Sequence, residues 1–546
     1  AGTELDAVLA EVCRAAGGRA SRRLWLPPLE AHPTVSALRA RYPDARAGHA
    51  PWELDPVVGE LDDPARQGKR PLTLPLSREG NAVVYGAVGS GAEGLLGTVV
   101  YSLACDHGAD EFGIYVIDLG SELLGLLSPL PQVGDVALSG EDEKVARLLD
   151  MLEGEVERRR RALSSMGVGY AALRSGGGEG MPAVLLVLNG VAAFSELYER
   201  LEPRLVRLVR EGPRVGISTL LCATAPNEAR LRLRQGLKQQ LVCSLANQAD
   251  YLSVFSSMRG VAVPHGLCRG LVELGKERLT FQGAFIAEKD GDERGVVEAL
   301  ARRSAAGGRT RGVRLMPEHV RVGEAGSLVV GGALIVGLYS DNLDPVVLDT
   351  LETPLRRAVY TLPRAGRIFV SGMVAAAVTA GIDVRLADCG HLLDDLPAVC
   401  VDATSDCDQM ARWLWELSNG GGAGSLHLVI VTDILTALAG MADRARASEA
   451  GWAIGGLKRG GNTLLVLVDS INNAGYVHEG WYMAHQSASD GIWLGSGADS
   501  QTMVRIAYGT GDKLVGGLGD EDGYVVVVGR PRRARFISLE GHDEDE

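Results

Sequence analysis

Short runs of apolar residues recur along the chain and are separated by longer segments with helical periodicity. In the first half, apolar runs predict strands at 81–85, 113–118, 183–188 and 216–223. Apolar residues spaced three and four apart predict helices at 95–104 and from 141 to about 163, after a lead-in helix at 4–16. Continuously apolar strands that alternate with helices indicate a parallel sheet covered on both faces.

The second half repeats this order. Strands are predicted at 357–362, 382–388, 426–431 and 463–468, with a loop at 363–368 and a helix at 406–417. Such a repeat indicates two tandem α/β domains of one fold. We expect a lead-in helix and connector at 1–50, domains at 51–312 and 313–539 joined near 311–332, and a solvated acidic tail at 540–546.

The charge of the chain disfavours nucleic acid as a partner. The net charge is −14, so the molecule as a whole repels a phosphate backbone. Four consecutive arginines, Arg158 to Arg161, form the most basic run considered, but Glu153, Glu155 and Glu157 lie on the same predicted helix. Acidic residues three and four positions away predict an ion-paired, solvated helix face instead of a nucleic-acid contact.

Other features of composition favour a reduced, cytosolic protein of ordinary globular character. No apolar run approaches the roughly 18–20 residues of a spanning helix, and the first residues lack a signal-peptide pattern. The eight cysteines show no C-x-x-C spacing, and most lie in apolar runs. We therefore expect small buried thiols, and neither disulfides nor a metal site.

The loop after the first strand has the spacing of a phosphate-binding loop without its functional groups. The pattern G-x-x-x-x-G-K-[ST] uses backbone amides to cradle phosphates, Lys to reach the β- and γ-oxygens, and a hydroxyl to hold Mg²⁺. Gly86, Gly89, Ser90 and Gly91 preserve the shape of the loop. Ala92 stands at the Lys position and Glu93 at the hydroxyl position, where a carboxylate repels a triphosphate.

The metal-holding carboxylate expected at the end of a second strand is also absent from the first domain. That strand ends in Asn189, which has the shape of Asp without its charge. In the second domain the same frame places only Gly366 on a matching position, with Arg367 at the Lys position. Asp433 is the one candidate for a metal-site carboxylate there, although a strand-end Asp more often caps a turn. We therefore expect no catalytic residue, no bound metal, and little or no ATP hydrolysis.

Several segments resemble the FtsK/SpoIIIE-type ATPases of type VII secretion, in particular the EssC and EccC group. They are residues 58–67, 85–94, 114–120, 210–217, 268–272, 281–282 and 337–349. The resemblance spans essentially the whole chain, as the last two ATPase domains of that family, and is more specific in the first half. It implies two tandem P-loop NTPase domains of the RecA/FtsK-like α/β fold, with mostly parallel sheets flanked by helices.

The resemblance also implies a biological setting. The family consists of membrane-anchored motors that face the cytosol, use ATP and Mg²⁺, assemble into hexamers and recruit helical-hairpin substrates. The chain departs from the family pattern at Ala92, Glu93 and Asn189, and Pro213 stands where the family pattern expects an arginine finger. The expected role is therefore a substrate-docking and regulatory module at the cytoplasmic face of the membrane, with other domains of the same motor as partners.

Two alternatives remain open from the sequence. The first is a weak ATPase, in which the backbone amides of residues 86–91 hold phosphate and a neighbouring protomer supplies the cations. The second is an FtsK-type DNA translocase, which the charge of −14 and the missing Lys disfavour.

Overall fold

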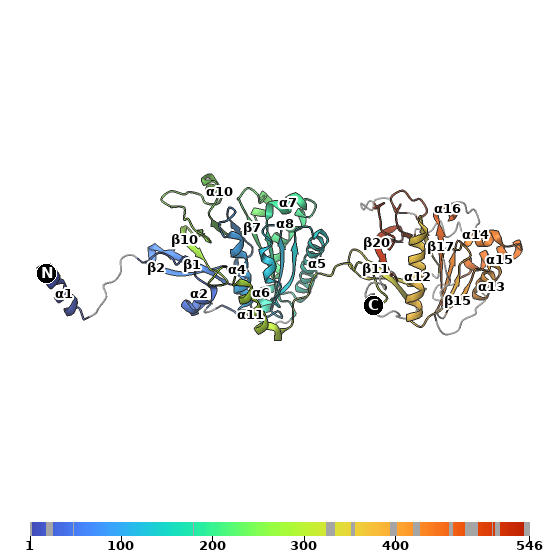
Figure 1. The fold of residues 1–546 in the computed structure, drawn as a ribbon, viewed down its shortest axis with the longest axis horizontal. Coiled ribbons are helices and arrows are strands. Elements are labelled where there is room, and N and C mark those ends of the chain that lie inside the picture. The colour runs from blue at the N-terminus through green and yellow to red at the C-terminus, as the bar shows by residue number, and fades with distance from the viewer. Residues whose placement is uncertain are drawn as a thin grey trace. The chain divides into compact units, whose positions relative to one another are not determined.

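A computed structural model describes most of the chain and divides it into two compact units, Ala1–Leu315 and Met316–Glu546 (Figure 1). The described residues are 3–17, 26–46, 49–177, 180–323, 333–350, 355–393, 401–418, 426–457, 462–474, 490–504, 506–507 and 514–539. The predicted acidic tail at 540–546 and residues 324–332 of the predicted junction at 311–332 lie outside these residues. No helix of the described ranges is long and apolar enough to cross a membrane.

The first unit is built on a ten-stranded sheet. In spatial order its strands are β2 (Gly68–Thr73), β1 (Val57–Asp63), β10 (Glu277–Gly283), β9 (Arg269–Leu274), β8 (Gln239–Cys243), β3 (Ala82–Tyr85), β7 (Ile217–Ala223), β6 (Ala183–Asn189), β4 (Phe112–Asp118) and β5 (Val133–Leu138). The strands from β8 to β5 are parallel, whereas β2, β1, β10 and β9 extend the sheet in antiparallel pairs. The sheet is therefore mixed and mostly parallel at its core.

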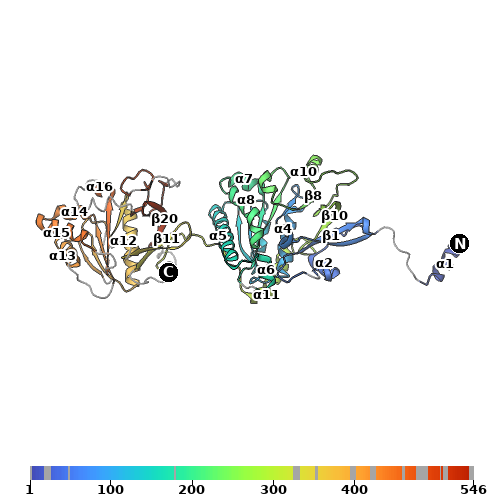
Figure 2. The ribbon, with the colours of Figure 1, turned by 180° about the vertical axis from the view of Figure 1, so that it is seen from behind.

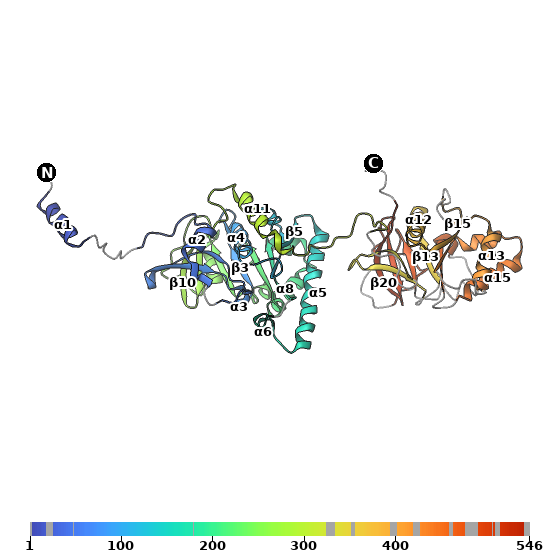
Figure 3. The ribbon, with the colours of Figure 1, turned by 90° about the horizontal axis from the view of Figure 1, so that it is seen from below.

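Helices cover both faces of this sheet (Figure 3). The helices of this unit that follow α1 (Glu4–Ala15), which buries no residue, are α2 (Val35–Arg41), α3 (Leu76–Glu79), α4 (Ala92–Ala104), α5 (Asp142–Met166), α6 (Tyr170–Ser175), α7 (Val191–Leu197), α8 (Glu202–Glu211), α9 (Leu231–Arg234), α10 (Tyr251–Val254) and α11 (Glu293–Ser304). Apolar side chains of α2, α4 and α11 form one core, and those of α5, α7 and α8 form the other. Since α4 follows β3 directly, this packing fixes the loop between them.

The second unit repeats the sheet of the first strand for strand. Figure 2 shows this unit from behind, with β11 and β20 near α12. Its order is β12 (Pro345–Asp349), β11 (Ala333–Tyr339), β20 (Arg530–Phe536), β19 (Asp522–Val527), β18 (Gly491–Leu494), β13 (Leu355–Tyr360), β17 (Thr463–Ser470), β16 (His427–Thr432), β14 (Asp383–Ala387) and β15 (Val401–Thr404). On its faces lie α12 (Pro363–Thr379), α13 (Cys407–Ser418), α14 (Ile434–Gly440), α15 (Arg444–Gly455) and α16 (Ile471–Ala474). The repeated strand order confirms the predicted duplication.

One predicted element of the second half is wrong. The predicted loop at 363–368 forms the first turns of α12, which begins at Pro363 directly after Leu362. Proline fits this position because its ring presets the helical φ, and the first N–H groups of a helix have no intrahelical partner. Gly366 and Arg367 therefore lie inside a helix, and neither occupies a phosphate-loop position.

The arginine run on α5 is ion-paired, as predicted. Arg158 and Arg159 bond Glu155, while Arg160 and Arg161 bond Glu157. Arg159 differs from the predicted solvated face because its side chain is buried. It donates to the carbonyls of Val215 (3.0 Å) and Pro182 (2.8 Å), so it ties the helix to the sheet.

Candidate functional site

The degenerate phosphate loop joins β3 to α4 at the carboxyl end of the parallel strands, where ligands of open α/β sheets bind. The amide of Gly86 donates to the carbonyl of Ala223 at 3.1 Å, and that of Ala87 donates to Ser244 at 2.8 Å. These bonds tie the start of the loop to the strands on either side of β3. Backbone bonds of the chain itself thus hold the loop against the sheet.

Glycine is required at two points of this loop. A Cβ on Gly86 would lie 2.4 Å from the Ser90 hydroxyl oxygen, so the chain closes too tightly for any side chain. Gly91 caps α4 with φ of +85°, a conformation that favours glycine, and a Cβ there would lie 2.5 Å from the Cys268 sulfur. The tight turn of this loop therefore depends on its glycines.

Cys268 holds the loop from the opposite side. Its amide donates to the Ser90 carbonyl at 2.8 Å, and its thiol donates to the Gly91 carbonyl at 3.2 Å. Burial raises the pKa of this thiol to about 12, so it stays protonated and can donate at neutral pH. Sequence reasoning treated Cys268 only as a buried small residue and missed its contact with the loop, which joins positions far apart in the chain.

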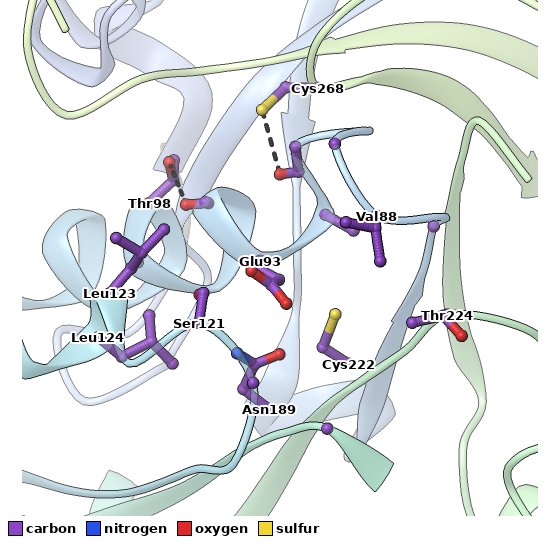
Figure 4. A pocket seen from close by; sticks show the side chains of 18 of the residues that line it. Val88, Glu93, Thr98, Ser121, Leu123, Leu124, Asn189, Cys222, Thr224 and Cys268 are labelled. Atoms are coloured by element: carbon purple, nitrogen blue, oxygen red, sulfur yellow. Dashed lines mark hydrogen bonds between the residues drawn. The ribbon is translucent and has the colours of Figure 1, made fainter. Parts of the chain in front are cut away.

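At the position of the motif lysine the loop has the methyl group of Ala92, and at the position of the metal-binding hydroxyl it has the carboxylate of Glu93. Ala92 is buried at the start of α4, and its side chain faces Gly86. The Glu93 carboxylate points into the pocket, toward Ser121, Asn189 and Cys222 (Figure 4). Within the described part of the chain, Glu93 forms no salt bridge.

Asn189 is bonded to a buried aspartate that sequence reasoning did not single out as a site residue. The Asn189 amide donates to Asp118 Oδ1 at 2.7 Å, and the two residues lie side by side at the ends of β6 and β4. Asp118 also accepts from the amides of Gly120 (3.2 Å) and Leu124 (3.0 Å). This buried carboxylate therefore shapes the loop after β4, and Asn189 completes its hydrogen bonds.

The second unit contains an equivalent arrangement. Asp388 follows β14 and accepts from the amides of Leu392 and Leu393, each at 2.9 Å, and from the Thr432 hydroxyl at 2.5 Å. The last register pair of β14 and β16 is Ala387 with Val431, so Asp388 stands beside Thr432 as Asp118 stands beside Asn189. Thr432 is thus the counterpart of Asn189.

Asp433, the predicted metal-site candidate, is one position further along the chain. It precedes α14 with φ of +44°, as Gly190 precedes α7 with φ of +87°. Its carboxylate accepts from the Ser470 amide at 2.9 Å and from the Tyr360 hydroxyl at 3.3 Å. Burial raises the pKa of Tyr360, and the neighbouring Asp433 carboxylate raises it further, so the phenol remains a donor.

A cavity of about 800 Å³ opens beside the loop of the first unit. Its walls are mainly apolar and include Leu119, Leu124, Leu127, Cys222 and Ile286. The ionisable side chains of the described chain that line it, apart from thiols, are all acidic: Glu93, Glu228, Asp290 and Glu293. The phosphates of Mg·ATP need cations beside them, and no described lining residue supplies one, so these side chains do not fit a triphosphate.

No metal site is found elsewhere in the described ranges, where no group of three or more His, Cys, Asp or Glu is placed to hold an ion. The described cysteines are free thiols.

The chain is similar to proteins of type VII secretion. Residues 44–256 match the FtsK/SpoIIIE family. The ESX-4 secretion system protein EccC4 of Mycobacterium tuberculosis is 32% identical over 239 residues, which are 43% of this chain and 19% of that protein. The chain thus spans about a fifth of the length of this relative, and the resemblance drawn from the sequence is confirmed.

Two solved structures share the fold of the chain. ATPases 2 and 3 of EssC from Geobacillus thermodenitrificans superpose with a TM-score of 0.78 at 16% identity, covering 94% of this chain and 100% of that one. ATPases 2 and 3 of Thermomonospora curvata EccC, in complex with a signal sequence peptide, superpose with a TM-score of 0.61 at 21% identity, covering 94% and 97%. Tandem FtsK-like P-loop domains are therefore the fold of this chain.

Proposed function

Starting from its place among the FtsK/SpoIIIE-type ATPases of type VII secretion, as their ATPases 2 and 3, we propose that the chain is a docking and regulatory module that does not hydrolyse ATP. In this proposal it works at the cytoplasmic face of the membrane, as part of a membrane-anchored, hexameric motor. Its partners are secreted helical-hairpin substrates and the other domains of the motor, and nucleic acid is not among them.

One observation carries the non-hydrolysing part of the proposal. The loop of the first unit keeps its fold while its surroundings have the wrong charge for a triphosphate: Ala92 supplies no cation, and Glu93 adds a negative charge. Losing a charge-assisted contact costs about 1.5–3 kcal/mol. Loss of two such contacts reduces affinity by roughly two to four orders of magnitude.

We expect isothermal titration of the chain with Mg·ATP to give no binding heat at millimolar nucleotide, and turnover assays to give no phosphate release. The physical reason is the missing cation at a loop that otherwise has room for phosphate. The valine side chain of the Gly91→Val variant would collide with Cys268. Binding heat that the wild type gives and this variant lacks would favour the weak-ATPase alternative. Robust hydrolysis abolished by Asp433→Ala would overturn the proposal.

The docking part of the proposal is supported by the T. curvata EccC structure, which contains a signal sequence peptide. In this chain, the second unit exposes two tryptophans on neighbouring helices: Trp415 of α13 is 55% exposed and Trp452 of α15 is 72% exposed. Exposed aromatic residues of this size commonly dominate the binding energy of protein interfaces. We therefore propose that this tryptophan pair contributes to substrate docking.

Trp452→Ala is expected to weaken the binding of fluorescently labelled signal peptides from candidate type VII substrates by about 30-fold, as for an interface hot spot of about 2 kcal/mol. Fluorescence anisotropy measures the affinity. Val528→Ala is the matched control, because Val528 is also 72% exposed and lies on the β19–β20 turn of the same unit. If the wild type and Trp452→Ala bind the peptides with equal affinity, the proposal that the tryptophan pair contributes to docking is contradicted.

A further inference from the structure

The cavity beside the degenerate loop retains the size of a ligand site. Its volume of about 800 Å³ lies within the range of roughly 300–1,000 Å³ that is typical of small-molecule sites. A loop that had merely lost its nucleotide would be expected to close over the space or to fill it with side chains. The cavity instead remains open, so its lining indicates which other ligand would fit.

The walls of this cavity are suited to an apolar body. Leu119, Leu124 and Leu127 form part of the lining, with Ile286 on another segment. At the mouth, Val88 is 93% exposed, Leu123 is 58% exposed and Leu267 is 49% exposed. Covering such apolar surface stabilises a complex by about 25 cal/mol per Å² removed from water.

The charges of the cavity select the sign of the ligand. Glu93 points into it from the first turn of α4, and Asp290 and Glu293 line another part. Glu228 is already bonded to the amide of Thr224 at 2.8 Å, and its carboxylate therefore has an internal partner. Glu293 likewise accepts from the Gly291 amide at 2.8 Å. The Glu93 carboxylate points into the cavity (Figure 4), and we assign to it the contact with a cation of the ligand.

We propose that this cavity binds a small organic cation with an apolar body, whose ammonium group pairs with Glu93 while its body packs against the leucines. The inference rests on the proposed loss of nucleotide binding, since both ligands would occupy the same space. A carboxylate and a cation inside a partly enclosed apolar site attract each other more strongly than they do in water. The loop has thus exchanged a preference for polyanions for a preference for cations.

The test compares two fluorescent probes that share one apolar body. Dansylcadaverine ends in an ammonium group, and dansyl-6-aminohexanoate ends in a carboxylate. We expect the intact chain to bind the amine at least about 10-fold more tightly than the acid, as measured by fluorescence anisotropy. Glu93→Gln is expected to remove this preference by weakening amine binding about 10-fold, while acid binding stays equal or becomes tighter because the repelling carboxylate is gone.

Two further variants make the result specific. Glu79→Gln removes an exposed carboxylate from outside the cavity lining and is expected to change neither affinity. Leu123→Ala shortens a side chain at the mouth and is expected to weaken both probes by about 3- to 10-fold.

Equal binding of the two probes to the intact chain, or no binding of either, would overturn the inference. So would an amine preference that survives Glu93→Gln. Titration of Mg·ATP in the same samples separates this result from the proposed function. Binding of Mg·ATP contradicts the proposed function, whether or not the amine probe binds. A chain that binds neither Mg·ATP nor the amine probe contradicts only the proposed cation site.

Discussion

Replacing Ala92 by Lys and Glu93 by Thr is expected to raise the affinity of the first unit for Mg·ATP by about two to four orders of magnitude. The double variant restores the cation and the hydroxyl at a loop whose glycines already have the required conformation. Each restored contact contributes about 1.5–3 kcal/mol, and about 1.4 kcal/mol corresponds to a factor of ten. Isothermal titration calorimetry of the wild type and the variant measures the difference.

Single variants separate the two contributions. Ala92→Lys alone restores the cation but leaves the Glu93 carboxylate, so we expect a smaller gain than in the double variant. Hydrolysis should not return in either case, because Asn189 is still neutral and already bonded to Asp118. A folded double variant that binds nucleotide no better than the wild type would show that side-chain charge is not what prevents binding.

Asp118→Ala is expected to destabilise the first unit by about 3–5 kcal/mol. Asp118 is fully buried, and its removal leaves the amides of Gly120 and Leu124 and the Asn189 side chain without their acceptor. Each buried donor left unsatisfied costs about 1–3 kcal/mol. Urea unfolding measures the free energy, and hydrogen exchange of residues 119–127 shows where protection is lost.

The control for this variant is Asp110→Ala, which removes an exposed aspartate from the same unit and should change stability by less than about 0.5 kcal/mol. Because Asp388 has the equivalent role in the second unit, Asp388→Ala should destabilise that unit by a similar amount. An Asp118→Ala protein as stable as the control would mean that solvent replaces the lost acceptor.

Most central strands of the two sheets were predictable because they are continuous apolar runs, as β6 and β17 are. Two depart from this pattern: β8 begins with Gln239 and Gln240 and was not predicted, and β13 carries the buried Arg356 and Arg357. The antiparallel strands that extend each sheet could not be predicted from the apolar pattern. Among them, β2 contains Lys69, Arg70 and Pro71, and β20 carries four arginines. The polar side chains of β20 find partners that are distant in sequence. Arg532 pairs with Asp341 and lies over the Tyr339 ring, and Arg535 pairs with Asp522. A pattern based on local hydrophobicity does not contain such contacts.

The candidate site, like the sheets, was predictable from the sequence only in part. The substitutions at Ala92 and Glu93 could be recognised from the sequence because the phosphate-loop motif is local and its spacing is fixed. The bond between Asp118 and Asn189 joins residues 71 positions apart, so it depends on the order of the strands. The second unit shows the converse error: a motif frame applied without a structure placed Arg367 in a loop, whereas it lies within α12.

The aspartate at the end of one central strand in each unit has a consequence for how such proteins diverge. Asp118 and Asp388 bond to backbone amides of their own loops, so the framework of each site is held by the polypeptide itself. Mutations at the ligand-facing positions can then accumulate without unfolding the domain. Each duplicated copy can thereby change its ligand-facing residues while it keeps its fold.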